Sequence, residues 1–153
     1  MTKVVIYKVN VEFGDCDPAK IVWFPNYFKW LDAASRNFFV KCGVPSWKET
    51  EKTMGVLGTP LVDIHTKFVK TASYGDQLDI HVRVNEWRNT SFVMNYTIYR
   101  DKDLILEAQD VRVFAAFCAQ SQALGTSPHP KRLGAFCGFP VWQSRWADRG
   151  GVD

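Results

Sequence analysis

The sequence predicts a single α+β domain in which one antiparallel sheet packs against one long helix. Three observations predict this class: a β-branched and aromatic segment near the N-terminus, one well-framed helical stripe after it, and four consecutive segments of alternating residues. A helix with an apolar stripe must bury that stripe, and one face of a sheet is a suitable partner. A chain of 153 residues suits one core better than two.

The first strand and the helix are the most clearly defined elements. Residues 4–13 are rich in β-branched and aromatic types. Residues 14–18 are a turn-forming run of small and polar types. Residues 25–42 then carry one apolar stripe at helical spacing, formed by Tyr27, Trp30, Leu31, Ala34 and Phe38. Pro25 suits the first helical turn, and Gly43 suits the position just past the helix end.

Strands are expected in the second half of the chain. They follow a predicted loop that contains Pro45, Trp47, Gly55, Gly58 and Pro60. Alternation then predicts strands over residues 61–70, 77–87, 91–100 and 104–117. A short hairpin connection at residues 101–103 joins the last two. The expected order is therefore one strand, one central helix and an antiparallel meander.

The alternating pattern decays beyond about Cys118. Residues 120–129 are turn-like, and the remainder has no clear periodicity. We therefore expect a folded domain over residues 1–118 and a C-terminal tail of uncertain structure over residues 119–153.

Composition and charge exclude several classes of protein. Apolar residues make up 46% of the chain and charged residues 23%, as in ordinary globular proteins. The net charge is +3 and the cations are interspersed with acids, so no nucleic-acid partner is expected. No segment reaches the roughly 18–20 apolar residues of a membrane span, so no membrane partner is expected. The N-terminus alternates apolar and polar residues instead of forming an apolar signal core, which favours a cytoplasmic location.

Neither the cysteines nor the histidines predict a metal site. A zinc site needs clustered soft ligands, whereas the four cysteines stand apart at Cys16, Cys42, Cys118 and Cys137. The histidines are too dispersed for a metal triad or a Ser-His-Asp relay, at His65, His81 and His129. No metal is therefore expected.

Asp17 is the strongest candidate for chemistry. It lies in the turn between the first strand and the helix. A helix N-terminus offers unpaired N–H groups and a partial positive charge, which polarise a carbonyl and hold a developing oxyanion. A carboxylate a few residues upstream can then act as nucleophile or general base on that carbonyl. The alternative is that Asp17 is only a turn or cap residue.

The residues around Asp17 carry a longer motif. Residues 13–27 read FGDCDPAKIVWFPNY, which closely resembles the signature of 4-hydroxybenzoyl-CoA thioesterases in the hotdog superfamily. The similarity continues through residues 30–37, 41–43, 58–60, 71–74, 86–88 and 91–93, and it spans roughly residues 8–117. It implies a hotdog fold, in which an antiparallel sheet wraps around one long central helix, and the activity of a thioester hydrolase.

The resemblance also implies roles for particular residues. Asp17 matches the catalytic carboxylate, which attacks the thioester carbon or activates water, and the backbone N–H of Phe24 matches the donor that polarises the carbonyl. Segments bordering the acyl pocket contain Trp47, Asp32 and Thr59. Arg88 matches a basic side chain near the CoA phosphates. The family builds its sites between subunits of a homodimer or homotetramer, and it uses neither metal nor cofactor, because CoA is part of the substrate.

Each substrate-binding role has a structural alternative. For Trp47 the alternative is a core residue that anchors its loop, and for Thr59 it is a residue that only shapes the turn before Pro60. Asp32 is equally consistent with a solvated position on the polar side of the helix, and Arg88 with an ordinary surface cation.

The sequence departs from the family pattern at three places. Lys20 stands where the family usually has glycine, which changes the turn or its charge close to Asp17. Asn89 and Thr90 replace a further basic residue after Arg88. The chain after Phe117 lacks the family's usual ending. Related bacterial acyl-CoA thioesterases carry histidine where Phe24 stands, so this position favours the aromatic-substrate side.

Hydrolysis of an acyl-CoA thioester is therefore the leading interpretation, with an aromatic, 4-hydroxybenzoyl-like acyl group favoured. A thioesterase for short or medium aliphatic acyl-CoA is the first alternative, and a hotdog protein that binds acyl-CoA without hydrolysing it is the second. A dehydratase of the same fold would need a histidine near the helix, and none of the three lies there.

Overall fold

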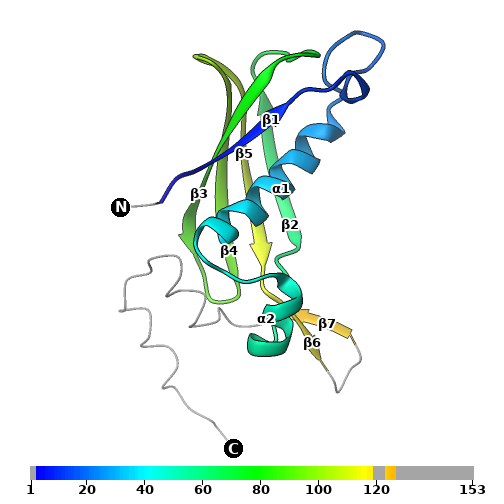
Figure 1. Cartoon of the computed structure of the whole chain (residues 1–153). Helices are drawn as coiled ribbons and strands as arrows, with labels where there is room; N and C mark the ends of the chain where they lie inside the picture. The colour runs from blue at the N-terminus through cyan, green and yellow to red at the C-terminus, as the bar shows by residue number, and fades with distance from the viewer. Residues whose placement is uncertain (1–2, 119–122, 127–153) are drawn as a thin grey trace, which may run out of the picture.

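The computed structural model describes residues 3–118 and 123–126. In this part of the chain a five-stranded antiparallel sheet forms the body of the molecule (Figure 1). In spatial order its strands are β1 (Val5–Asn10), β3 (Gln77–Trp87), β4 (Ser91–Arg100), β5 (Asp103–Val113) and β2 (Leu61–Phe68). The meander expected for the second half of the chain is confirmed for β3, β4 and β5.

Strand β2 does not continue the meander. It precedes β3 in the sequence but pairs with β5 at the opposite edge of the sheet. The segment between β2 and β3 must therefore cross the end of the sheet. Alternation identifies a strand, but it cannot tell which neighbour the strand will choose, because both edges of a meander offer unpaired backbone groups.

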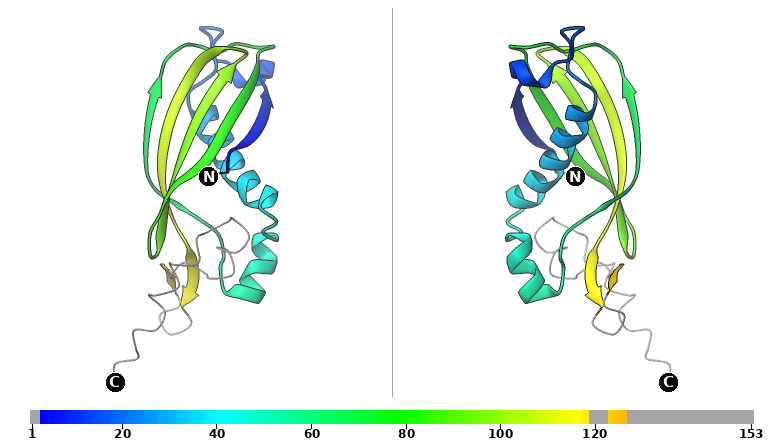
Figure 2. Two further views of the ribbon diagram at one scale, coloured as in Figure 1. Left: turned by 90° about the vertical axis from the view of Figure 1, so that its left-hand side faces the viewer. Right: turned by 90° about the vertical axis from the view of Figure 1, so that its right-hand side faces the viewer.

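Helix α1 (Pro25–Lys41) covers one face of the sheet, as Figures 1 and 2 show. The predicted stripe is buried throughout, with Tyr27, Trp30, Leu31, Ala34 and Phe38 between 0% and 8% exposed. The facing side chains of β3 are at most 3% exposed, at Leu78, Ile80, Val82 and Val84. Each large apolar side chain buried in this layer contributes roughly 1.5–3 kcal/mol. The predicted sheet around one central helix, the hotdog arrangement, is thus the arrangement found.

A second helix occupies a segment that we expected to be a loop. Helix α2 (Trp47–Met54) begins after Ser46, whose hydroxyl accepts a hydrogen bond from the N–H of Glu49 at 3.4 Å. It ends at Gly55, whose φ of 69° is the left-handed conformation that glycine adopts without strain. The prediction was wrong because two helical turns give too short a stripe to recognise, whereas the proline and glycine on either side resemble a loop.

The last predicted strand, over residues 104–117, is divided in two. Strand β5 ends at Val113, and β6 (Ala115–Cys118) pairs outside the main sheet with β7 (Ala123–Thr126). Between them Phe114 is fully buried, and its N–H donates to the carbonyl of Thr90 rather than to the sheet ladder. Strand β7 lies within the predicted tail, and residues 119–122 and 127–153 of that tail lie outside the described residues.

The first strand is shorter than predicted. It ends at Asn10, and a short 3-10 helix, η1 (Phe13–Asp15), leads into the segment that contains Asp17. The change of direction follows from the carboxylate of Asp15, which accepts the N–H of Glu12 at 2.8 Å and closes a local turn. None of the helices in residues 3–118 is both long enough and apolar enough to cross a membrane.

Candidate active site

Asp17 lies in a tight loop immediately before helix α1. Its N–H donates to the carbonyl of Ile21 at 2.9 Å, and its own carbonyl accepts the N–H of Lys20 at 2.8 Å. One carboxylate oxygen, Oδ1, accepts the N–H of Ala19 at 2.8 Å. The other, Oδ2, has no hydrogen-bond partner in the described residues and stays available to a ligand or a water molecule. The side chain is only half-buried, so it is open to solvent.

The start of α1 leaves one backbone donor open. Phe24 is the N-cap residue, and no side chain caps the helix. Pro25 has no N–H, while Asn26 and Tyr27 donate to the carbonyls of Trp23 and Phe24 at 2.9 and 3.2 Å. The N–H of Phe24 itself finds no acceptor among the described residues. An uncapped helix end with a free N–H is a site at which partial positive charge can meet a carbonyl oxygen.

The backbone holds Asp17 and Phe24 in a fixed relation. The loop between them is closed by an isolated antiparallel bridge between Cys16 and Val22. The carbonyl of Asp15 accepts both the N–H of Trp23 and the side-chain amide of Asn26, each at 2.9 Å. The two residues predicted to act on one carbonyl therefore belong to one hydrogen-bonded unit.

Three of the predicted substrate-binding residues line one cavity of about 260 Å³. Asp32 comes from α1, Trp47 from the first turn of α2, and Thr59 from the segment before β2. The segment around Thr59 is held against the end of β5, because the carbonyls of Gly58 and Pro60 accept the N–H groups of Ala115 and Val113. Residues far apart in the sequence thus meet at one place.

Trp47 is an aromatic wall rather than a core residue alone. Its ring packs against Phe39 with centroids 5.6 Å apart and lies 4.4 Å from the guanidinium carbon of Arg36. Arg36 donates one N–H to the carbonyl of Pro45 at 2.7 Å, while its other terminal nitrogen, Nη1, is buried without a partner in the part of the chain that the structure describes. Burial lowers the pKa of Arg36. The cavity therefore combines an aromatic surface with an unused hydrogen-bond donor.

A buried charged network supports the carboxylate of Asp32, and the sequence did not reveal it. The guanidinium of Arg112, on β5, donates at 2.8 Å to both Asp32 and Asp110, and it also reaches the carbonyl of Thr59 at 3.1 Å. The hydroxyl of Tyr96 donates to Asp110 at 2.8 Å. The side chains of Arg112 and Asp110 are 5% and 0% exposed, whereas that of Asp32 is 72% exposed.

Burial and the neighbouring charges shift the pKa values of Asp110 and Arg112. Burial raises the pKa of Asp110, against the opposing effects of Arg112 and Tyr96. Burial alone would lower the pKa of Arg112, but Tyr96, Asp110 and Asp32 outweigh it and raise that pKa, so the guanidinium stays charged. Charged residues in a strand usually face solvent, but Asp110 and Arg112 lie on the same face of β5 as the buried Leu106 and Ala108. Their spacing of two residues, one face of a strand, is the signal that could have found them.

Arg88 lies apart from the loop that holds Asp17 and Phe24 and does not line the cavity. It follows the last residue of β3, in the turn to β4, and its guanidinium donates to both carboxylate oxygens of Glu86 at 2.9 and 3.0 Å. Both side chains are about half exposed, so solvent screens the pair and holds it weakly. Arg88 is thus a surface cation that can exchange its partner for another anion.

The predicted site residues form two separate groups. Figures 1 and 2 show the segment between β1 and α1 at one end and α2 at the other. Asp32 lies eight residues after Phe24, which is roughly 12 Å along a helix axis at 1.5 Å per residue. A single chain thus holds Asp17 and Phe24 in one place and Asp32, Trp47 and Thr59 in another.

Other features of the surface are weaker candidates for a binding or catalytic site. A larger hollow of about 530 Å³ lies on the sheet face that α1 does not cover, and it contains none of the predicted residues. We assign the site to the smaller cavity because its lining joins an aromatic ring, a carboxylate and an unpaired donor. In residues 3–118 and 123–126, no three His, Cys, Asp or Glu side chains gather as a metal site would require.

This fold and this site define a class: a hotdog-fold protein with a carboxylate beside an uncapped helix N-terminus. A family model described as the Thioesterase-like superfamily matches residues 11–137. The chain is 49% identical over 120 residues to 4-hydroxybenzoyl-CoA thioesterase from Pseudomonas sp. (strain CBS-3), covering 75% of this chain and 85% of that protein. The chain therefore belongs to the Thioesterase-like superfamily, and it is a thioester hydrolase.

Solved structures agree with this assignment. The structure of the Pseudomonas enzyme matches with a TM-score of 0.83 at 42% identity, covering 88% of this chain and 99% of that one. A gentisyl-coenzyme A thioesterase matches with a TM-score of 0.75 at 27% identity, covering 86% and 98%. An aspartate-to-asparagine variant of 4-hydroxybenzoyl-CoA thioesterase, in complex with 4-hydroxybenzoyl-CoA, matches with a TM-score of 0.82 at 42% identity, covering 88% and 98%.

Proposed function

We propose that this thioesterase hydrolyses an aromatic acyl-CoA, with 4-hydroxybenzoyl-CoA as its preferred substrate. The observation that carries the proposal is the cavity that Trp47 and the exposed carboxylate of Asp32 both line. An aryl ring stacks on the indole, and a ring hydroxyl donates to the carboxylate. Arg112 donates to Oδ1 of that carboxylate at 2.8 Å and holds it in place as an acceptor. The similarity to a 4-hydroxybenzoyl-CoA thioesterase supports the same substrate.

The chemistry is proposed for Asp17 and Phe24. The thioester oxygen accepts the open N–H of Phe24, which withdraws electrons from the carbonyl carbon and stabilises the oxyanion that forms there. Asp17 then acts in one of two ways. As nucleophile, its Oδ2 bonds to the carbonyl carbon, CoA leaves as thiolate, and water hydrolyses the resulting anhydride to two carboxylates. As general base, Asp17 takes a proton from water while the water oxygen bonds to that carbon and the thiolate leaves.

Both routes consume one water molecule and release the carboxylate product and free CoA. They use a carboxylate and a backbone N–H of the protein, so we propose no metal and no cofactor beyond the CoA of the substrate. Arg88 is proposed to exchange Glu86 for a CoA phosphate, which its weak, exposed ion pair permits.

The complete site is proposed to lie between two chains. Phe24 and Asp32 are roughly 12 Å apart along the axis of α1, which is more than the length of a benzoyl group. A second chain, packed so that its cavity faces the α1 N-terminus of the first, would bring the two groups together. This homo-oligomer is a dimer or a tetramer, and the cytoplasmic location expected from the sequence stays a prediction.

A panel of acyl-CoA substrates tests the substrate class, with thiol release as the measurement. Stacking adds about 0.5–1.5 kcal/mol, and at 1.4 kcal/mol per tenfold this is up to about one decade in kcat/KM. A hydroxyl bonded to Asp32 adds more. We expect 4-hydroxybenzoyl- or benzoyl-CoA to exceed hexanoyl-CoA by roughly tenfold or more. Equal or faster hydrolysis of hexanoyl-CoA would favour an aliphatic thioesterase, and binding without thiol release would favour a carrier.

A further inference from the structure

Lys20, three residues after Asp17, has a backbone conformation that suits glycine. Its φ is 63°, and the other positive φ of a non-glycine among the described residues belongs to Asp101, a type that tolerates this region. The N–H of Lys20 donates to the carbonyl of Asp17 at 2.8 Å. The left-handed conformation of Lys20 is therefore what turns the chain back toward Asp17, and a lysine adopts it only when its surroundings hold it there.

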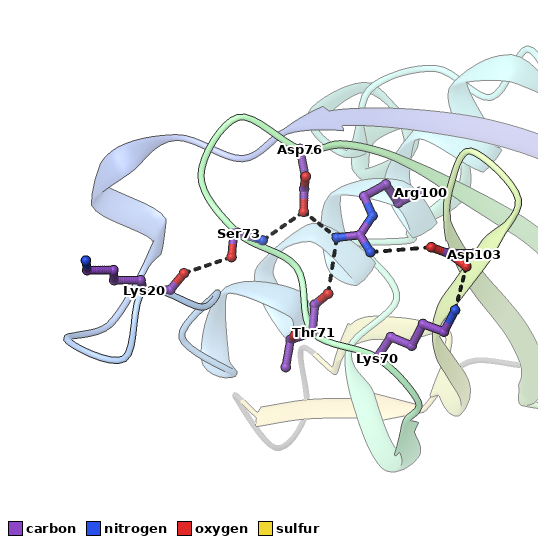
Figure 3. A network of polar contacts seen from close by, with 7 residues as sticks. All are labelled: Lys20, Lys70, Thr71, Ser73, Asp76, Arg100 and Asp103. Carbon is purple, nitrogen blue, oxygen red and sulfur yellow. Dashed lines mark hydrogen bonds and ion pairs between the residues drawn. The ribbon is translucent and has the colours of Figure 1, made fainter.

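A side chain from another part of the sequence holds Lys20. The hydroxyl of Ser73, in the segment between β2 and β3, donates to the carbonyl of Lys20 at 2.8 Å (Figure 3). Beside it, the carbonyl of Ala72 accepts the N–H of Val22 at 2.8 Å. Ser73 thus reaches directly the peptide group that has the strained conformation.

Ser73 is itself fixed by an ion pair. The Oδ2 atom of Asp76 accepts both the N–H of Ser73 at 2.9 Å and the guanidinium of Arg100 at 2.8 Å. Arg100 is the last residue of β4, and it also donates to the carbonyl of Thr71 at 3.3 Å. The side chains of Arg100 and Asp76 are 29% and 23% exposed, whereas the surface pair Lys8–Asp79 is 79% and 41% exposed. Figure 3 shows a continuous path from the sheet to Lys20.

We propose that Ser73, held by Asp76 and Arg100, is a positioning residue that keeps Lys20 in its left-handed conformation and thereby orients the carboxylate of Asp17. The proposal rests on the proposed catalytic role of Asp17. The Ser73–Lys20 bond lies outside the sheet ladders and the α1 core. Loss of this hydrogen bond should therefore change the orientation of the Asp17 carboxylate much more than the stability of the fold.

The first test is Ser73→Ala. We expect kcat to fall about two- to tenfold, the effect of one hydrogen bond, while KM and the urea midpoint of unfolding change little. Ser73→Thr keeps the hydroxyl and should restore kcat. Thr53→Ala is the matched control, because Thr53 also donates its hydroxyl to a backbone carbonyl, that of Glu49 at 2.9 Å, but on α2 at the other end of the molecule. A lower kcat with Thr53→Ala, or none with Ser73→Ala, would overturn the proposal.

The second test combines Ser73→Ala with changes at Lys20. Lys20→Gly removes the conformational strain and the charge, whereas Lys20→Ala removes the charge alone, because alanine at positive φ stays strained. Ser73→Ala should therefore lower kcat in the Lys20→Ala background and change it less than about twofold in the Lys20→Gly background. Equal losses in both backgrounds would show that Ser73 does not act through this conformation.

Asp17→Asn separates this inference from the proposed function. If Asp17→Asn leaves kcat near the wild-type value, the proposed mechanism fails and the positioning role fails with it. If Asp17→Asn abolishes turnover but Ser73→Ala does not lower kcat, only the positioning role fails. In the Asp17→Asn background, Ser73→Ala should cause no further loss, because there is no longer a catalytic carboxylate to orient.

Discussion

At the scale of single residues, the candidate site depends on two polar groups that have no hydrogen-bond partner among the described residues, one in Asp17 and one in Phe24. Asp17 uses one carboxylate oxygen to close its own loop, and the other has no partner within residues 3–118 and 123–126. Pro25 has no N–H and the next two N–H groups bond within the turn, so the N–H of Phe24, which has no acceptor among the described residues, is the open donor at this helix start. Unsatisfied groups at a half-exposed position are tolerated because water bonds to them until a substrate replaces it. The same two groups that cost little in the free protein are those proposed to act on the thioester.

Substitution of the carboxylate tests this interpretation. Asp17→Asn keeps the shape of the side chain and removes its charge, so kcat should fall by about 100-fold or more, as expected for the loss of a nucleophile or base. Circular dichroism and urea unfolding should show an unchanged fold, since the amide oxygen still accepts the N–H of Ala19. Near wild-type turnover would mean that Asp17 is a turn residue.

Asp32 owes its availability to its neighbours. Arg112 is shared between a buried and an exposed carboxylate, and the buried one, Asp110, is also bonded to Tyr96. The buried carboxylate balances the guanidinium in the core, which leaves the exposed Asp32 with charge to offer a ligand. A buried ion pair of this kind does little for stability, and here it fixes the position of a polar group in the cavity that Trp47 also lines.

At the scale of elements, helix α2 carries the aromatic wall of the cavity. Its eight residues are too few for a helix that is stable by itself, so it depends on its caps and its packing. Thr50 is buried in it and donates to the carbonyls of Trp47 and Val56 at 3.0 and 2.8 Å. The Trp47 ring packs on Phe39 of α1. The position of Trp47 therefore depends on α2 being folded.

Removing the N-cap of α2 should lower stability and loosen this wall. Ser46→Ala removes the hydroxyl that accepts the N–H of Glu49, which should cost about 1 kcal/mol of unfolding free energy in urea. Lys48→Ala is the control, because it changes an exposed side chain in the same helix. If α2 positions Trp47, Ser46→Ala should also raise KM for benzoyl-CoA more than for hexanoyl-CoA. Equal losses from both variants would argue against a role for the cap.

At the scale of the whole molecule, the sheet presents one face to α1 and the other to its surroundings. The edges are β1 and β2, and large apolar side chains are exposed on both of them, including Ile6, Leu61 and Phe68. Phe13, Trp23 and Phe24, in the segment around Asp17, are 54–80% exposed. Apolar surface of this kind is typical of a surface that another chain covers.

We therefore expect the protein to be an oligomer in solution. Light scattering at micromolar concentration should give the mass of a dimer or a tetramer of the 17.5 kDa chain. A stable monomer with full activity would show that one chain holds the whole site.

Mixed oligomers provide the control for this prediction. Asp17→Asn and Trp47→Ala chains, co-expressed with different tags and purified for both, should regain activity, because one site of each mixed dimer contains neither change. The two variants purified separately should each remain impaired. No regain in the mixed protein would place Asp17 and Trp47 in the same site of a single chain.

The sequence by itself determined the central helix, the buried face of the sheet and the location of Asp17. These follow from local rules: the spacing of apolar residues sets which face is buried, and Pro25 and Gly43 set where the helix begins and ends. The resemblance of residues 13–27 to a known family led to the thioester hydrolase before any contact was known. Those conclusions hold because each depends on residues close together in the chain.

Only the tertiary structure decided the rest. Strand β2 lies beside β5 because strand pairing is chosen across the whole sheet, and α2 forms because its caps and Thr50 outweigh the loop-like residues around it. Asp110 and Arg112 are buried because Asp32 and Tyr96 arrive from other elements to satisfy them. Ser73 reaches Lys20 across 53 residues of sequence. Such contacts join distant segments, and a one-dimensional pattern holds no record of which distant groups a fold will bring within hydrogen-bonding distance.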